Sequence, residues 1–355
     1  MEVGVLSAPR AALPAALLVA GLLAGCATGV SDTGPAVPPA TPASAPLGGP
    51  PPAGTVVPLG APATAVVVDP GTGTVVVALA DPPRLVLRTL DDTAPPREVP
   101  PREVPLPGPA ADLVPAAAGG PLLVPVATPG CLIRVPLQSG VLSRTDLAGP
   151  ARGVVEVGGT GAAGGLTVVA LGDRLAVLGG GRSPVSIPGF SEATRLVPAG
   201  APSGNKIWVL DRGRSAVSVV DVSSGVISPA LRAGNGAANA VADRFARMLV
   251  TDTRDGELLA FAGDPPVLRQ RFPLPGAPWA LAYDGRRDLA WVTLTARDEV
   301  VGLDVAAGEP VIMYRFRTVH EPNSVAVDPV SGRVLVASAS GAGLQVINPE
   351  RVVRQ

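Results

Sequence analysis

Short apolar runs separated by turn residues recur through the C-terminal half of the chain. The clearest unit has apolar stretches at residues 322–328, 334–337 and 344–348, with turn residues at 331–333 and 338–342. Apolar runs of roughly four to eight residues, bounded by Gly, Pro, Asn, Asp or Ser, are typical of β-strands. The unit therefore predicts three short antiparallel strands.

The same unit recurs upstream at nearly constant spacing. The first stretch ends at Asp243, Asp284 and Asp328, which are 41 and 44 residues apart. The third stretch ends at Asp221, Gly263, Asp304 and Asn348. A fourth run lies between units, as at Val267–Phe272 and Val311–Phe316. Four strands in about 42 residues are the pattern of a β-propeller blade.

The first half of the chain follows the pattern less regularly. One unit opens at Ala65–Asp69, and others centre on residues 111–137, 154–178 and 195–221. This gives seven units between about residue 61 and residue 350. We therefore expect an all-β chain that forms a seven-bladed β-propeller.

Two local features complete this prediction. Pro95–Val99 is repeated at once as Pro100–Val104, which indicates a duplication in a loop beside an outer strand, where proline and insertions are tolerated. The last unit lacks a fourth strand, and Thr55–Gly60 resembles the outer strand Arg271–Gly276. We therefore expect residues 55–60 to complete the last blade, so that no open junction remains.

The N-terminus has the layout of a secretory signal. One basic residue, Arg10, precedes the apolar stretch Ala11–Leu23, which is shorter than the about 20 residues of a membrane span. The stretch ends in Leu23–Cys26, which resembles the bacterial lipobox. That resemblance implies that Cys26 receives a diacylglyceryl group. The alternative is an ordinary cleaved signal in which the cysteine stands by chance.

A proline-rich segment follows the cysteine. Residues 27–54 contain eight prolines, and most of the rest are Ala, Ser, Thr and Gly. Such a composition cannot bury a core, so it predicts a disordered, extended tether. The expected organisation is a signal peptide at 1–25, the lipidated cysteine and tether at 26–54, and the propeller at 55–355.

Composition excludes several classes of protein. The 47% hydrophobic content is too high for a disordered chain, while 43 Gly and 42 Pro leave few windows for long helices. The 28 basic and 29 acidic residues give a net charge of −1, so we expect no nucleic-acid partner. The first aromatic residue is Phe190, which excludes stacking platforms for bases in the first half.

Few residues offer catalytic chemistry. The single histidine, His320, rules out the common zinc and copper sites, and no Gly-x-Ser-x-Gly motif occurs. Cys131 lies in an apolar run and is expected to be a small buried residue. We therefore assign no catalytic residue, metal or cofactor; a Ca²⁺ ion held by aspartates and carbonyl groups is the alternative. The turns Asp211–Arg214 and Asp252–Gly256 are interpreted as local Asx-turns.

One end of the central channel carries the remaining candidates. In a propeller the beginnings of the inner strands line this mouth, and here they carry polar or aromatic residues. The candidate ligand-binding residues are Asn235, Asn239, Trp279, His320, Glu321 and Asn323. They suit a small polar ligand or a peptide. The alternative is that they cap strands and fill the mouth with water-linked polar groups.

The repeats resemble the YVTN/NHL class of seven-bladed β-propellers. The resemblance is carried by Pro322–Asp328, by Trp208–Asp211 with Ser218–Asp221, and by Leu249–Arg254. From the lipobox to the segment Ser340–Ile347, the chain also resembles the LppL-type conserved lipoproteins of actinobacteria. That family implies a lipid-anchored propeller of the cell envelope and no known reaction.

These observations favour a binding or scaffold protein over an enzyme. We expect a monomer on the outer face of the plasma membrane, anchored through the lipid on Cys26, with an envelope protein as its partner. The alternative is an enzyme of the propeller lactonase or lyase type that works at His320 and Glu321.

Overall fold

The computed structural model describes residues 1, 2, 4, 38–89, 101–116, 120–138, 141–158, 165–179, 183–200 and 204–351. The chain divides into two compact units, Met1–Ala36 and Val37–Gln355. Cys26, and with it the predicted lipidation, lies outside the described residues, as does the first copy of the duplication, Pro95–Val99. Every element in the described residues is a β-strand. None of them belongs to a helix long and apolar enough to span a bilayer.

The strands of the second unit form antiparallel sheets, five of which have four strands. The first two sheets contain β2 (Ala63–Val68), β3 (Thr74–Ala80), β4 (Pro83–Thr89) and β5 (Arg102–Pro105), and then β6 (Val114–Pro115), β7 (Pro121–Val126), β8 (Cys131–Pro136) and β9 (Ser143–Asp146). Two later sheets contain β18 (Ala237–Ala242), β19 (Met248–Asp252), β20 (Glu257–Ala262) and β21 (Val267–Pro273), and then β22 (Pro278–Asp284), β23 (Leu289–Leu294), β24 (Glu299–Asp304) and β25 (Val311–Arg317).

The fifth four-stranded sheet joins the two ends of the folded unit. It consists of β26 (Pro322–Val327), β27 (Val334–Ser338), β28 (Leu344–Ile347) and the N-terminal β1 (Thr55–Val57). β1 pairs antiparallel with β28, with Val56 opposite Gln345. The pairing expected from the resemblance of residues 55–60 to an outer strand is therefore present.

One sheet departs from the four-strand pattern, because it has eight strands. They are β10 (Gly153–Val157), β11 (Leu166–Ala170), β12 (Gly172–Leu178), β13 (Val185–Pro198), β14 (Lys206–Asp211), β15 (Ala216–Asp221), β16 (Val226–Ile227) and β17 (Leu231–Arg232). The 14-residue β13 pairs with β12 through its first part and with β14 through its second part. One continuous strand thus serves as the last strand of one repeat and the first strand of the next.

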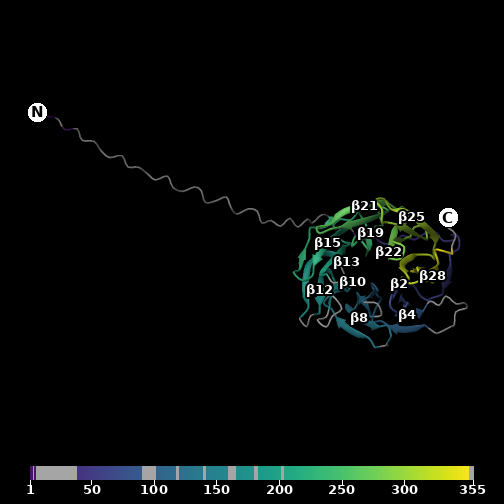
Figure 1. Ribbon diagram of the computed structural model, residues 1–355. Helices are drawn as coiled ribbons and strands as arrows, with labels where there is room; N and C mark the ends of the chain where they lie inside the picture. The colour runs from purple at the N-terminus through teal and green to yellow at the C-terminus, as the bar shows by residue number, and fades with distance from the viewer. Residues whose placement is uncertain are drawn as a thin grey trace. The chain divides into compact units, whose positions relative to one another are not determined.

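The sheets of the second unit stand in a ring. In Figure 1 the first strands of the repeats, such as β2, β10 and β22, lie nearest the centre, and β21 and β25 lie at the rim. These inner strands contact one another in the order β10, β13, β18, β22, β26 and β2. The all-β prediction and the radial arrangement of a propeller are both confirmed.

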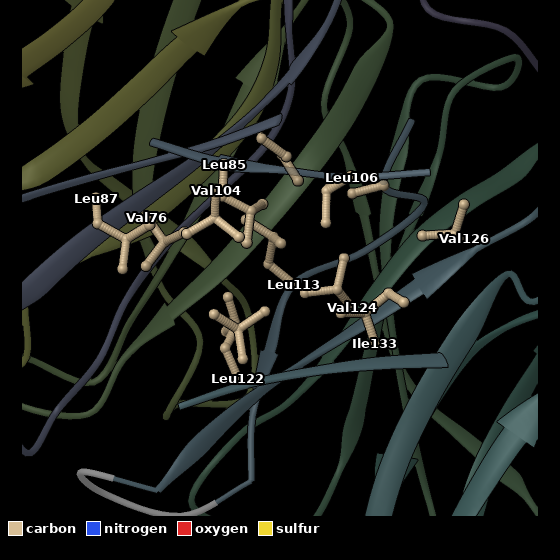
Figure 2. Packing of buried hydrophobic residues seen from close by; sticks show 14 of the residues in the cluster. Val76, Leu85, Leu87, Val104, Leu106, Leu113, Leu122, Val124, Val126 and Ile133 are labelled. Atoms are coloured by element: carbon tan, nitrogen blue, oxygen red, sulfur yellow. The ribbon is translucent and has the colours of Figure 1, made fainter. Parts of the chain in front are cut away.

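Hydrophobic clusters fill the spaces between neighbouring sheets. In Figure 2, Val76 and Leu85 of the β2–β5 sheet face Leu122, Val124 and Ile133 of the β6–β9 sheet. Another cluster joins the β26–β28 strands to the β2–β4 strands, which connects the last sheet to the first. The middle strands are buried on both faces, and this explains their continuous apolar runs. Cys131 is fully buried in the first of these clusters, as expected, and burial raises the pKa of its thiol.

The repeated aspartates close the turn that follows each inner strand. Asp243 accepts hydrogen bonds from the backbone N–H groups of Phe245 and Arg247, at 2.9 and 3.0 Å. Asp284 and Asp328 do the same in their own repeats, and all three are buried. A carboxylate satisfies the buried N–H groups of a tight turn, which is why the sequence keeps aspartate at this position.

The proline-rich segment 38–54 does not extend away as a spacer. The composition predicts a tether as far as residue 54, but residues 38–54 belong to the second unit and contact the propeller. At its end, Ala53 donates to the carbonyl oxygen of Arg317 at 3.0 Å and accepts from Gln345 Nε2 at 2.6 Å. Polyproline segments leave their backbone groups unpaired, so these groups are available to side chains of a neighbouring surface.

Candidate functional site

One face of the ring is built from the beginnings of the inner strands and from the turns that connect second and third strands; we call it the mouth face. Asp252, at the end of β19, accepts hydrogen bonds from the N–H groups of Asn235 and Gly236 just before β18, both at 2.8 Å. The inner strands also share a register shift at their beginnings, for example between Ala237 and Asn239 in β18 and between Pro322 and Ser324 in β26. Such bulges redirect side chains, and here they occur on the mouth face.

Residues 38–45, the N-terminal strap, lie on the mouth face. Arg254 Nη2 donates to the carbonyl oxygen of Pro38, and Arg212 Nη2 donates to that of Ala40. The N–H of Ala43 donates to Thr295 Oγ1 at 3.0 Å. Ala40 and Ala45 are buried. The strap is therefore held mainly through its backbone, as an extended peptide ligand would be.

The second part of the strap meets His320 and Glu321. The hydroxyl of Ser44 donates to Glu321 Oε1 at 3.1 Å and lies 3.4 Å from His320 Nε2. On its other side His320 Nδ1 lies 2.8 Å from Asp298 Oδ2. Imidazole, two carboxylates and a hydroxyl thus form one hydrogen-bonded group.

A cavity of about 650 Å³ lies beside this group. Residues 45–52 form one wall, and Arg297, Asp298, Arg317 and His320 are on the other. The cavity is large enough for a small molecule and is lined by both charges and proline rings. The positive φ of Asp298, 48°, matches Gly256 and Ser215 at the same position of two other turns, so it belongs to the repeat.

Asn239 and Trp279 are brought together, while Asn235 lies beside them at the surface. Asn239 Nδ2 donates to the carbonyl oxygen of Trp279 at 3.2 Å, and its Oδ1 accepts from Arg195 Nε at 2.9 Å. Asn235 is exposed, and its carbonyl oxygen accepts from Arg254 Nη1 at 2.9 Å. The amide of Asn239 therefore ties neighbouring inner strands together.

His320, Glu321 and Asn323 form the other part of the predicted site. The N–H of Asn323 donates to the carbonyl oxygen of Glu321 at 2.8 Å. Asn323 Oδ1 is buried and has no hydrogen-bond partner among the described residues. The six candidate residues thus divide into an Asn239 group, next to arginines, and a His320 group, next to Asp298.

Four arginines gather beside the Asn239 group; Arg152, Arg195, Arg212 and Arg254 are called the arginine cluster below. The guanidinium of Arg212 lies 5.4 Å from the centre of the Trp279 ring, a cation–π distance. Arg195 forms an ion pair with Asp112, and Arg152 lies 3.4 Å from Glu192. Sequence reasoning missed this cluster.

Arg212 has the most perturbed environment of the four. Burial lowers the pKa of its guanidinium, Glu192 raises it, and the charges of Arg195, Arg152 and Arg254 lower it further. Its Nε is buried and lacks a hydrogen-bond partner among the described residues, and the same is true of Arg152 Nε. Positive charge is therefore concentrated where little water solvates it.

The sequence contains a signal for this cluster in the turns Asp211–Arg214 and Asp252–Gly256, each of which carries an arginine of the cluster shortly after an aspartate. The interpretation as local Asx-turns covers only part of their chemistry. The carboxylate of Asp211 accepts from the N–H groups of Ser191 and Glu192, at 2.7 and 2.8 Å, and Asp252 makes the equivalent bonds one repeat later. These carboxylates fix the turns against the inner strands, which directs the arginines toward the strap.

Among the described residues, one acidic group has the spacing of a metal site: Asp252, Asp255 and Glu257. The two less exposed residues of the group, Asp252 and Glu257, already have hydrogen-bond partners. Asp252 binds backbone N–H groups, and both oxygens of Glu257 accept from Arg271 Nε at 2.8 Å. This arrangement has the character of a turn with an ion pair.

Comparison with known proteins establishes the fold and no family. No family model and no curated protein matches the chain. The Cps50 (Swd1) β-propeller domain of Myceliophteria thermophila is similar in structure, with a TM-score of 0.68 and 12% identity over 84% of this chain and 99% of that one. A streptogramin B lyase is similar with a TM-score of 0.65 and 12% identity, covering 82% and 96%.

A third structure is a catalytically inactive variant of virginiamycin B lyase from Staphylococcus aureus with quinupristin. Its TM-score is 0.63 and its identity 13%, over 82% of this chain and 97% of that one. Similarity at this level of identity shows that the chain has the fold of a β-propeller and says nothing of its activity.

Proposed function

We propose that this chain is a seven-bladed propeller, anchored by a lipid on Cys26 to the outer face of the plasma membrane, that binds an extended peptide segment of an envelope protein at its mouth face. The observation that carries the binding role is the strap. Residues 38–45 occupy the mouth face through backbone hydrogen bonds to Arg212, Arg254 and Thr295. A surface that holds one extended segment in this way suits another of the same kind.

The arrangement of the sheets supports the proposed number of blades. β13 divides the eight-stranded sheet into two four-stranded units, since the short β16 and β17 both pair with β15 and share the outer position. Together with the five four-stranded sheets this supports seven blades. The membrane anchor rests on the lipobox resemblance of Leu23–Cys26 alone.

A test of the binding role uses the complete mature chain with residues 38–45 replaced by Gly and Ser. A synthetic peptide of residues 38–46 should bind this variant with a Kd below about 1 mM and should bind the unchanged chain several-fold more weakly, because a tethered segment competes at an effective concentration in the millimolar range. Trp279 reports binding by fluorescence, since it is half-buried on the mouth face while Trp208 and Trp291 are fully buried.

Two controls decide the outcome. A peptide of scrambled order should not bind, and Trp279→Phe should remove the fluorescence change. Absence of peptide binding to the Gly-Ser variant at millimolar concentration would refute the binding role. If the peptide binds, cross-linking in intact envelopes should recover one specific partner from the Gly-Ser variant in greater yield than from the unchanged chain.

A second candidate is an enzyme that works at His320. The observation that favours it is the Asp298–His320 pair beside the cavity of about 650 Å³, in a fold shared with streptogramin B lyases. A carboxylate that orients an imidazole is a common arrangement for general base catalysis. Loss of turnover of a streptogramin B substrate in His320→Ala, with peptide binding retained, would favour this candidate; absence of turnover in the unchanged chain would remove it.

A further inference from the structure

Two arginines of the cluster, Arg212 and Arg254, face the strap without an ion pair to a carboxylate among the described residues, whereas Arg152 and Arg195 lie beside Glu192 and Asp112. Arg212 and Arg254 bind carbonyl oxygens only two residues apart on the strap, so their guanidinium groups lie within roughly 10 Å of each other. Arg152 and Arg195 belong to the same neighbourhood, because the charges of both lower the pKa of Arg212. The backbone of Glu192 also accepts from the N–H of Arg212, while its side chain faces Arg152.

Four acidic groups near the cluster are already engaged. Asp112 is paired with Arg195, and Glu192 lies 3.4 Å from Arg152. The carboxylates of Asp211 and Asp252 accept hydrogen bonds from backbone N–H groups of the preceding segments. Arg212 and Arg254 are left facing the strap, where the groups that they bind are neutral carbonyl oxygens.

A neutral carbonyl is a weak partner for a partly buried guanidinium. A carboxylate accepts two parallel N–H bonds from a guanidinium and also carries the opposite charge, which a single carbonyl oxygen does not. The buried Nε of Arg212, which lacks a partner among the described residues, is a further donor at this position.

We propose that the arginine cluster is an anion-recognition site, and that the ligand of the mouth face is an acidic peptide whose carboxylates replace the carbonyl oxygens of Pro38 and Ala40. This inference rests on the proposed function, because it specifies the ligand class of the same site. The strap then acts as a neutral placeholder, which an acidic segment displaces and a neutral one does not.

The test compares two peptides on the Gly-Ser variant of residues 38–45. One peptide has the sequence of residues 38–46, and the other carries Pro38→Glu, at a position that is exposed beside Arg254. We expect the acidic peptide to bind about tenfold more tightly in low salt and to lose most of that advantage at 0.5 M NaCl, where the screening length is below about 5 Å.

Two matched arginine variants test whether the tighter binding of the acidic peptide depends on Arg254. Arg254→Gln should abolish the advantage of the acidic peptide, and because Arg254 is exposed the fold should be kept. Arg214→Gln is the control, since Arg214 lies on the turn of Arg212 but donates to the carbonyl oxygen of Gly189 at 2.7 Å; it should keep the advantage.

The outcomes separate the two proposals. If both peptides bind equally, or if the advantage survives Arg254→Gln, the anion site is refuted while peptide binding stands. If neither peptide binds, both proposals fail. In the chain that keeps its own strap, the single substitution Pro38→Glu should slow exchange of the Ala43 amide several-fold, because the acidic residue would hold the strap more firmly. Equal or faster exchange would contradict the inference.

Discussion

Two segments from the N-terminal part of the folded unit are bound to the propeller in opposite ways. β1 is a strand of the last sheet, paired residue for residue with β28. The strap, only ten residues earlier, makes no strand pairing and is held by side chains of four different turns and strand beginnings. The difference indicates that β1 is part of the fold, whereas the strap is a separate segment held on the surface of the propeller.

The largest effect should follow from removing β1. Replacing residues 55–60 by Gly and Ser removes the apolar contacts of Val56 and Leu59 and weakens the ladder with β28. The expected loss is about 5 kcal/mol, at roughly 2 kcal/mol for each apolar side chain and 1 kcal/mol for a lost hydrogen bond. We expect the Tm to fall by about 10 °C in calorimetry.

The buried thiol of Cys131 gives an independent measure of the same loss. In a chain with Cys26→Ser, a thiol reagent should label Cys131 at least a hundredfold faster after the replacement of residues 55–60, because labelling requires opening of the core. An unchanged Tm together with an unchanged labelling rate would show that β1 does not complete the fold.

A single substitution should give an intermediate effect. Gly54 has a φ of 72°, and a Cβ at this position would clash with the carbonyl oxygen of Val346. Gly54→Ala should therefore disturb the start of β1 and cost about 2 kcal/mol, or about 4 °C in Tm. Gly49→Ala, five residues earlier in open space, is the control and should leave the Tm unchanged.

Removing the strap should change the overall stability little. In the Gly-Ser variant of residues 38–45 the Tm should stay within about 2 °C of the unchanged chain, since the lost contacts are hydrogen bonds of partly exposed groups. A fall as large as that caused by the loss of β1 would place the strap in the fold and remove the distinction.

The smallest effect should come from Ser44→Ala. The hydroxyl of Ser44 donates to Glu321 on an exposed part of the strap. Its loss should therefore weaken the binding of the strap to the mouth face by about 0.5–1 kcal/mol. Amide exchange of Ala43 should accelerate about threefold, with no change in Tm. Protection that is unaffected would mean that the backbone contacts alone hold the strap.

The fold could be predicted because the residue pattern within each repeat is enough to specify its strands and turns. The Val- and Leu-rich runs specify strands buried on both faces, and the aspartate after each inner strand specifies its turn. The continuity of β13 could not be predicted, because it depends on residues 189–192 staying extended between two repeats, where the sequence has no apolar period.

The candidate site was only partly predictable for a physical reason. Strand beginnings place Asn239, Trp279 and His320 on one face, and the repeat spacing is enough to deduce that. The arginines come from two different sheets, and the strap is held mainly through its backbone, whose carbonyl oxygens are the same for every residue type. A proline-rich composition therefore gives no sign of where the segment lies.

The order of the two segments along the chain has a mechanical consequence. Any pull on the chain from before Pro38 reaches the bonds of the strap before it reaches β1. The strap contacts would yield one after another, like a peeled strip, while the ladder of β1 with β28 and the grip of Gln345 on Ala53 stay intact. Tension on the chain would thus expose the mouth face while the sheets of the propeller remain folded, so the strap would respond to force before the fold does.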